Sequence, residues 1–339
     1  MKKARVLLLV HKHLVPPRKI VADKLASACW KMEWDIISTL KRRGHEVRVI
    51  GLDEDLSPIR PMIDEFNPTI VFNLMEAFAG TSIFDQNVVS YLELLRAPYT
   101  GCNPRGLMLS RDKALAKKVL TYHGIPVPDF FVVPRGQKGT IPKRLSYPLI
   151  VKSLVLDSSQ GISQVSVVAN DDHLDKRVRF IHGHIGTDAL VEQFVSGREF
   201  YVGVLGNSRL HVLPVWEMSF GKMPGSLWHI VTERAKWSIG YQRRYGMDTR
   251  KAALTKRIAA RVQNLAKSAY RALNLTGYAR IDMRMDSQEQ IVVIEANANP
   301  QLMRGALFAE SAQSAKLSYG RLLERIMALG LQWQPEGPG

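Results

Sequence analysis

Cysteine is scarce in this chain of 339 residues, which has only Cys29 and Cys102. Their separation is not that of a zinc site, and two thiols do not make a disulfide framework. Reduced thiols fit a cytoplasmic protein, which is the location we expect. Long hydrophobic runs are also lacking, and nothing approaches the length of a membrane span. The apolar run Val6–Val10 near the start is interrupted at once by His11, so it predicts a buried first strand and not a signal peptide.

Acidic residues are few relative to basic ones. The 31 Asp and Glu against 47 Lys and Arg leave a formal net charge of +16. Such a charge attracts something anionic, and a nucleotide, a nucleic acid, an acidic substrate or a membrane surface would each qualify. No basic run is interleaved with aromatic residues in the manner of a single-strand binding platform. A solvated basic surface is the simplest interpretation, and a non-catalytic nucleic-acid binder stays a remote alternative.

The N-terminal part has the order of a parallel α/β sheet. The predicted elements are strands at Val6–Val10, Glu46–Ile50 and Thr69–Asn73, with a helix over residues 21–43. Ligands of such sheets bind beyond the carboxyl ends of the strands, here at the loops His11–Pro17 and Leu74–Thr81. His11, His13 and Glu76 are therefore candidate substrate residues, although loop histidines are as often merely solvated.

Two adjacent strands near the C-terminus carry the most informative pattern. Tyr278–Met285 and Ile291–Ala296 alternate in character and are joined by a polar turn. Folding one strand back on the other brings Asp282 to within about one residue of facing Glu295, with Asn297 on the same side. Hard oxygen ligands of this kind suit Mg²⁺. The alternative is an ordinary hairpin with one solvated face of mixed charge.

Two loops between these regions have the composition of ligand-binding segments. The strand Tyr147–Lys152 ends on a lysine and precedes Ser153–Ser163, a small-residue loop whose backbone N–H groups can wrap a phosphate, although a plain turn is the commoner outcome. The irregular segment Glu217–Asp248 is long enough for a functional lid. We also expect a two-residue hairpin turn at Gly206-Asn207 and an amphipathic helix over Lys251–Leu273.

Several short motifs occur in an order that resembles the ATP-grasp superfamily, and within it the D-alanine–D-alanine ligase branch. They are Phe72-Asn73-Leu74 with Glu76, Ala97–Gly101, Asp112-Lys113, Gly124–Pro128, Ile150-Val151-Lys152 with Ser158–Gly161, Val191–Gln193, Gly197–Phe200, Arg280-Ile281-Asp282 and Glu295-Ala296-Asn297. Each motif alone is weak, but the ordered set spans most of the chain and is specific.

The resemblance implies an ATP-grasp fold, in which an N-terminal parallel-sheet domain accompanies two α+β lobes that clamp ATP. We expect an N-terminal substrate domain over residues 1–103, a central lobe over 104–187, and a C-terminal lobe with lid and metal site over 188–339. The implied reaction is ATP-dependent ligation of a carboxylate and an amine through an acyl phosphate, with Mg²⁺ or Mn²⁺. The family's habit also suggests a homodimer.

The resemblance also assigns roles to residues. It gives phosphate binding to Lys113 and Lys152 and to the mobile-loop residues Ser158 and Ser159, adenine recognition to the backbone of Glu192 and Val195, and ribose binding to Glu199. The expected metal ligands are Asp282, Glu295 and Asn297, and the expected catalytic groups are Arg280, Ser158 and Tyr245. Two lysines and an arginine beside a metal are what phosphoryl transfer requires, because charge spreads over the transferred group.

Departures from the family pattern bear on substrate choice. The ligases have a glutamate in the first loop that holds the amino group of the first D-alanine, and His11–Pro17 has no carboxylate. Gln301 replaces a family glycine, Ala306 stands near the place of a serine, and Arg244-Tyr245 matches the lid's Lys-Tyr pair only in part. We therefore expect altered substrate contacts, with small carboxylate and amine substrates, amino acids or a peptide among them. A true D-alanine–D-alanine ligase, or a ligase that adds amino acids to a peptide or protein, is the alternative.

Overall fold

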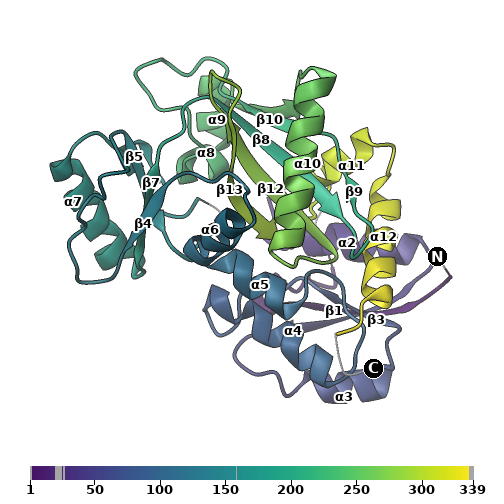
Figure 1. The fold of residues 1–339 in the computed structure, drawn as a ribbon. Helices are drawn as coiled ribbons and strands as arrows, with labels where there is room; N and C mark the ends of the chain where they lie inside the picture. Colours follow the sequence, from purple (N-terminus) through teal and green to yellow (C-terminus); the bar gives the residue numbers. More distant parts are fainter. Residues whose placement is uncertain (1, 20–24, 26, 158, 336–339) are drawn as a thin grey trace.

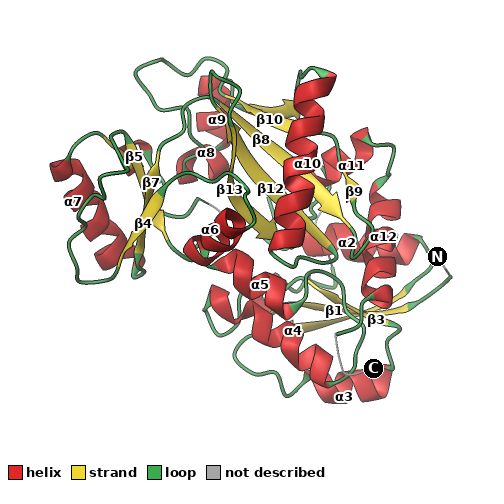
Figure 2. Ribbon diagram, viewed as in Figure 1, coloured by secondary structure: helices red, strands yellow, loops and turns green. Residues whose placement is uncertain are grey.

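The computed structural model describes residues 2–19, 25, 27–157 and 159–335 of the chain. Its strands form three separate sheets, and helices cover them (Figures 1 and 2). The N-terminal sheet has the order β2-β1-β3, with β1 (Arg5–His11), β2 (Glu46–Leu52) and β3 (Ile70–Asn73) all parallel. The predicted parallel sheet is confirmed.

Helices pack on both faces of this first sheet. They are α2 (Lys31–Arg42), α3 (Ile59–Phe66) and α4 (Asp85–Leu94). The predicted helix over 21–43 is confirmed only in its second part. Residues 20–24 and 26 lie outside the described residues, and Cys29 and Trp30 form a turn before α2. The stripe Ile36, Ile37 and Leu40 is buried against the sheet, as the helical spacing predicts.

The central lobe is built on an antiparallel sheet of order β4-β7-β5-β6. Its strands are β4 (Phe130–Val133), β5 (Leu149–Ser153), β6 (Val167–Val168) and β7 (Ala189–Gln193). Helices α5 (Pro104–Arg111) and α6 (Lys113–Tyr122) lead into it, and α7 (Asp171–Phe180) covers it. Because β7 belongs to this sheet, the change from one sheet to the next falls after Gln193, six residues beyond the expected boundary at 187.

The third sheet has the order β11-β10-β8-β12-β13. Its strands are β8 (Arg198–Leu205), β10 (Trp216–Ser219), β11 (Asp248–Lys251), β12 (Tyr278–Met285) and β13 (Ile291–Ala298), and β9 (His211–Val212) pairs with β8. The long helix α10 (Lys256–Ala272) packs on one face (Figure 1). It is shorter than predicted because Asp248–Lys251 pairs with β10 as an edge strand.

The expected two-residue turn at Gly206-Asn207 is wrong. Leu205 pairs with His211, so the connection from β8 to β9 takes five residues. Tertiary contacts override the local turn signal, because Gly206 donates its N–H to the Gly277 carbonyl. The Asn207 side chain accepts from the Gly277 N–H and donates to the Leu329 carbonyl.

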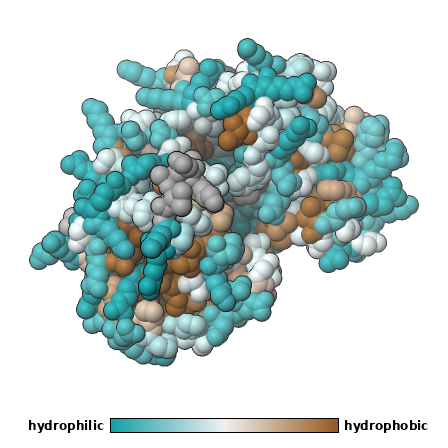
Figure 3. Space-filling view, turned by 180° about the vertical axis from the view of Figure 1, so that it is seen from behind, coloured by the Kyte–Doolittle hydropathy of each residue, from teal (hydrophilic) through white to brown (hydrophobic). Residues whose placement is uncertain are grey.

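The C-terminal helices join the C-terminal lobe to the N-terminal domain. They are α11 (Leu307–Ser314) and α12 (Tyr319–Gln332), and α12 returns to pack against the N-terminal sheet. Two lid helices, α8 (Glu233–Trp237) and α9 (Ile239–Tyr245), precede β11. Seen from the opposite side, the surface is mostly hydrophilic and apolar residues show only in patches (Figure 3). None of the helices in the described ranges has the length and apolar character needed to cross a membrane.

Gly330 marks the closest approach between α12 and the N-terminal domain. A Cβ placed on it would lie 2.1 Å from the Tyr99 carbonyl oxygen, which is backbone and cannot swing away. We expect Gly330→Ala to lower the free energy of unfolding by roughly 2 kcal/mol or more, measured by urea denaturation. Gly183→Ala, where a Cβ meets nothing within 4 Å, is the control and should change it by less than about 0.5 kcal/mol. Equal effects of the two variants would contradict this account of the contact.

Candidate active site

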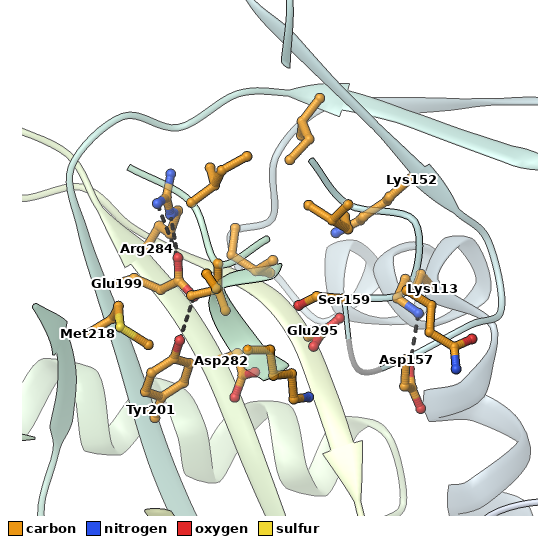
Figure 4. Close-up of a pocket in the computed structure, with 18 of the residues that line it drawn as sticks. Lys113, Lys152, Asp157, Ser159, Glu199, Tyr201, Met218, Asp282, Arg284 and Glu295 are labelled. Carbon is orange, nitrogen blue, oxygen red and sulfur yellow. Dashed lines mark hydrogen bonds and ion pairs between the residues drawn. The ribbon is translucent and has the colours of Figure 1, made fainter. Parts of the chain in front are cut away.

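A cavity with a volume of about 310 Å³ lies between the central and C-terminal lobes. Residues from both lobes and from the lid line it, so the two antiparallel sheets enclose it (Figure 4). Its charged lining is Lys113, Lys152, Asp157, Glu192, Glu199, Lys236, Arg280, Asp282, Arg284 and Glu295. Segments far apart in the sequence thus contribute charge to one space.

A buried ion triad forms one wall of the cavity. The Glu192 carboxylate on β7 lies 2.6 Å from the Lys152 ammonium and 3.0 Å from that of Lys117. All three side chains are nearly inaccessible to water. Burial alone would raise the pKa of Glu192, but the two ammonium groups outweigh it, so the pKa is lowered and the carboxylate stays ionised. The triad therefore holds the Lys152 ammonium at the cavity.

Lys117 also joins the two lobes. Its ammonium donates to the Ile294 carbonyl of β13 at 3.0 Å, while it pairs with Glu192 of the central sheet. A lysine four residues after Lys113 on α6 lies on the same helix face, which places both at the junction of the lobes. Lys117 was not among the predicted site residues, although its helical spacing from Lys113 was a signal for it.

Lys113 meets the small-residue loop. Its ammonium donates to the Leu156 carbonyl at 2.7 Å and to the Asp157 carboxylate at 3.1 Å. Arg111 pairs with Asp157 as well, and with Asp85 of α4. Asp112, the N-cap of α6, accepts hydrogen bonds from the Ala114 and Leu115 N–H groups and so fixes where the helix begins. The loop is thereby anchored beside two cations.

The hairpin of β12 and β13 places its acidic groups together as predicted. Asp282 is the register partner of Glu295, and the Asn297 amide nitrogen lies 3.1 Å from Asp282 and 3.2 Å from Glu295. Arg280 donates two hydrogen bonds to the Asp282 carboxylate, at 2.6 and 2.7 Å. Convergence of the two carboxylates and the carboxamide is thus a feature of the structure.

Burial and neighbouring charges shift the pKa values of the Asp282 and Glu295 carboxyl groups in opposite directions. Burial raises the pKa of Asp282 to about 6, although Arg280 opposes the shift. Burial would also raise the pKa of Glu295, but Lys113, Lys152 and Arg280 together lower it. Glu295 is therefore the more firmly ionised of the two.

The donor set fits a magnesium ion in part. Two carboxylates and one carboxamide are hard oxygen ligands, and Mg²⁺ leaves its other positions to phosphates and water. No group of three or more His, Cys, Asp or Glu side chains able to hold a metal occurs among the described residues. A bound ion would consequently depend on substrate oxygens to complete its coordination.

The other end of the cavity combines apolar walls with a polar rim. The apolar lining includes Ile150, Phe194, Met218, Ile230 and Ile294. Glu199 accepts from the Tyr201 hydroxyl at 2.7 Å and pairs with Arg284 at 3.1 Å. Arg284 also donates to the Val195 carbonyl at 2.7 Å. A flat apolar group with a polar edge fits this end.

Only some of the residues predicted for the phosphate loop and the lid line the cavity. Ser159 lines the cavity, and Ser158 lies outside the described residues. Arg244 and Tyr245 are not in the lining; Tyr245 packs in an apolar cluster of the lid with Tyr241, and Arg244 lies over its ring. Both residues lie on the lid helix α9. They do not reach the cavity, because Tyr245 packs into this apolar cluster.

Lys236 is the lid residue that the structure brings to the cavity. It lies on α8, and burial lowers the pKa of its ammonium, with Arg280 acting in the same direction. Lys236 was not among the predicted site residues. The predicted lid contains two pairs of a basic and an aromatic residue, Lys236-Trp237 and Arg244-Tyr245. Only the fold shows which of the two pairs reaches the cavity.

The predicted substrate residues lie at the junction with the N-terminal domain. Gln301 lines the main cavity and also a small neighbouring recess that Glu76 lines. His11 accepts from the Glu76 N–H at 3.3 Å and stacks on His13. Neither histidine lines either space. The structure therefore groups Glu76 and Gln301, and leaves the histidines behind them.

Comparisons with known proteins agree with this geometry. Residues 119–328 match the family model described as the D-ala D-ala ligase C-terminus. A D-alanine–D-alanine ligase of Desulforudis audaxviator is 30% identical over 306 residues, which cover 87% of this chain and 90% of that protein. An uncharacterized protein, y4sG, of Sinorhizobium fredii is 31% identical over 300 residues, covering 86% and 85%.

Solved structures share the whole fold. The D-alanine–D-alanine ligase of Bacillus anthracis, crystallised with ATP, covers 97% of this chain and 98% of its own, with a TM-score of 0.74 and 21% identity. The ligase of Coxiella burnetii covers 98% and 95%, with a TM-score of 0.70 and 19% identity. At these identities the likeness shows the fold.

The fold and site define an ATP-grasp protein. More narrowly, the chain belongs to the D-alanine–D-alanine ligase family within that superfamily. The predictions of the fold class and of an ATP-dependent ligase that forms C–N bonds are confirmed at the level of the family. The roles of the individual residues stay predictions.

Replacement of Lys117 tests whether the triad holds the site together. Lys117→Met keeps the length and buried volume of the side chain but leaves Glu192 with one ion pair and removes the contact to Ile294. We expect the free energy of unfolding to fall by roughly 3 kcal/mol, measured by urea denaturation. The neighbouring, exposed Lys118 supplies the control Lys118→Met, which should change it by less than about 0.5 kcal/mol. A neutral Lys117→Met would show that the triad contributes nothing to stability.

Proposed function

We propose that this protein uses ATP and Mg²⁺ to join a small carboxylate, an amino acid or peptide, to an amine through an acyl phosphate. One observation carries the proposal: three cations and two carboxylates from distant segments converge on a single cavity between the two antiparallel lobes. The cations are Lys113, Lys152 and Arg280, and the carboxylates are Asp282 and Glu295. Phosphoryl transfer is catalysed mainly by positioning and by neutralising charge, which is what such a set supplies.

Each cavity wall has a role in this proposal. The apolar end receives the adenine, with the backbone of Glu192 and Val195 at its edge, and Glu199 accepts hydrogen bonds from the ribose. Lys113 and Lys152 hold the phosphates, and Ser158 and Ser159 belong to the loop that covers them. Lys236 approaches from the lid and adds a further positive charge next to Arg280.

Arg280 stabilises the negative charge that develops during transfer. The substrate carboxylate attacks the γ-phosphorus, the bond to ADP breaks, and an acyl phosphate forms. The amine then attacks the acyl carbon, phosphate leaves, and the nitrogen loses a proton. Arg280 is suited to this transfer because its side chain is only partly exposed and its guanidinium is fixed by Asp282.

The metal ligands of the proposal are Asp282, Glu295 and Asn297. A bound Mg²⁺ would neutralise phosphate charge and orient the transferred group. Asp282 is paired with Arg280 in the structure. When a metal ion binds, Asp282 would exchange this arginine contact for a contact with the ion. We take the cytoplasm as the place of action and a homodimer as the assembly; both stay predictions.

The choice of substrates is the open part of the proposal. The relatives named as D-alanine–D-alanine ligases favour amino acids, and a ligase of two D-alanines is the second candidate. The His11–Pro17 loop lacks a carboxylate and Gln301 lies at the cavity, which favours altered contacts. Release of ADP in the presence of a panel of D- and L-amino acids and dipeptides tests both. Robust formation of D-alanyl-D-alanine would reject the altered-substrate proposal.

The Asp282→Asn variant tests the chemistry of the cavity. It keeps the size of the side chain and removes a negative charge from the proposed metal site. We expect ADP release to fall by a factor on the order of 100 or more, while the unfolding transition shows a folded protein. Asp64→Asn, at an exposed position, should leave the rate unchanged. Undiminished turnover in Asp282→Asn would contradict the proposed role of the hairpin.

A further inference from the structure

A groove with a volume of about 800 Å³ lies on the other side of the lid from the main cavity. Residues 161–165 of the small-residue loop and its continuation line it, together with α7 of the central lobe and the lid helices α8 and α9 (Figure 1). Ile162 lines both spaces, so the loop and the lid form the wall between them. Helix α8 divides its side chains accordingly, with Lys236 at the cavity and Arg234 and Trp237 at the groove.

Arg177 of α7 brings an uncompensated positive charge to this groove. It is 5% exposed, its guanidinium donates to the Gly161 carbonyl, and the guanidinium carbon lies 4.3 Å from the centre of the Phe180 ring. Its Nε atom is buried without an acceptor, and no carboxylate pairs with it within the described ranges. Burial lowers the pKa of Arg177 to about 10. A buried cation without a counter-ion favours the binding of an anion beside it.

Arg234 supplies a second positive charge from the lid. It is exposed on α8, and its guanidinium carbon lies 5.2 Å from the centre of the Tyr241 ring. No carboxylate pairs with it in the part of the chain that the structure describes. The carboxylate of Glu233 also lines the groove, but it accepts the Gly161 N–H at 2.8 Å. Among the described lining residues, two cations thus face one carboxylate that is already engaged.

The rest of the groove offers flat apolar surface. Trp237 is 63% exposed and Val165 is 69% exposed, and both line the groove. Phe180 and Tyr241 each lie against a guanidinium group, one on α7 and one in the lid. Large apolar side chains that stay exposed together are typical of a binding surface. Aromatic faces stack on a planar group, and a guanidinium fork binds a carboxylate, so the two walls fit an aromatic anion.

The groove also spans the junction between the loop and the lid. The Glu233 N–H donates to the Ile162 carbonyl at 2.9 Å. The Gln164 side chain donates to the Trp228 carbonyl at 3.0 Å and accepts from the Trp228 N–H at 2.8 Å. These hydrogen bonds hold the loop against the lid. A ligand that contacts both segments favours the arrangement in which they are joined, because that arrangement binds it better.

We propose that this groove binds a small organic anion, a carboxylate attached to a planar aromatic group, between Arg177 of the central lobe and Arg234 of the lid. Charge complementarity and the aromatic walls determine this class of ligand. The groove is separate from the main cavity, and binding in it does not require the ligase activity proposed above. Because the ligand joins the loop to the lid, it and a nucleotide in the main cavity favour each other's binding.

A matched pair of probes tests the groove in the full-length protein. The binding of 2-naphthoate and of its neutral counterpart 2-naphthamide is measured by titration calorimetry without nucleotide. We expect 2-naphthoate to bind on the order of tenfold more tightly, because only it carries the charge. Equal affinities, or no binding of 2-naphthoate, would overturn the proposal.

A nucleotide distinguishes the groove from the main cavity. With saturating ADP and Mg²⁺, the affinity for 2-naphthoate should rise by a factor of about two or more. Displacement of 2-naphthoate by ADP would place the probe in the main cavity and overturn the groove as its site. An unchanged affinity would reject the coupling between the two spaces. A protein that binds 2-naphthoate but no nucleotide would contradict the ligase function and leave the groove site standing.

Variants then assign the binding to residues. Arg234→Gln removes an exposed charge, so the affinity for 2-naphthoate should fall by about fivefold or more while that for 2-naphthamide stays the same. Arg177→Gln should act in the same direction, and urea denaturation shows whether this variant, which loses a contact to Gly161, stays folded. The control is Arg243→Gln, an exposed lid arginine outside the groove lining, which should change neither affinity.

The remaining outcomes assign the groove to another occupant. An equal loss of affinity in Arg243→Gln and Arg234→Gln would mean general attraction by the basic surface. Tighter binding of a hexapeptide of glutamate and phenylalanine than of 2-naphthoate would indicate a peptide groove. A dimer that the Trp237→Ser variant fails to form, measured by analytical ultracentrifugation, would assign the surface to a second copy of this chain. Each of these results would overturn the small-anion site.

Discussion

The structure depends on the buried ionic contact between the two antiparallel lobes. Glu192 of the central sheet takes two ammonium groups, and one of them, that of Lys117, also reaches the backbone of β13. A buried ionic arrangement stabilises the folded state only when every charge is paired. It therefore sets the distance between the lobes, and with it the width of the cavity in which Lys152 faces Glu295.

The three sheets have different parts in this arrangement. The C-terminal sheet is rigid where β12 lies between β8 and β13, and this position fixes Arg280, Asp282 and Glu295 to within the freedom of a side chain. The central lobe supplies Lys152 and the loop held at Asp157. The N-terminal sheet meets both through α12 and through the loop after β3, so that a small recess, lined by Glu76 and Gln301, adjoins the main cavity.

Residues with strong local signals were predictable. The hairpin could be read from the alternation of side chains over Tyr278–Met285, because strand pairing across a short polar turn leaves few choices of register. The parallel sheet followed from the order of its elements. Lys113, Lys152 and Glu199 were predicted from short motifs that carry the family resemblance, and the structure brings all three to one cavity. Local pattern was misleading at Gly206-Asn207, where long-range hydrogen bonds to Gly277 and Leu329 decide the course of the chain.

The amino-acid sequence by itself determined the family, the alternation that pairs Asp282 with Glu295, and the lysine that ends the strand before the small-residue loop. These features are local in the chain, so each is written in a few consecutive residues. The tertiary structure alone decided which basic residue of the lid reaches the cavity and that Lys117 joins the lobes. Such facts depend on which distant segments enclose a side chain, and burial and charge pairing follow from that enclosure and not from spacing along the sequence.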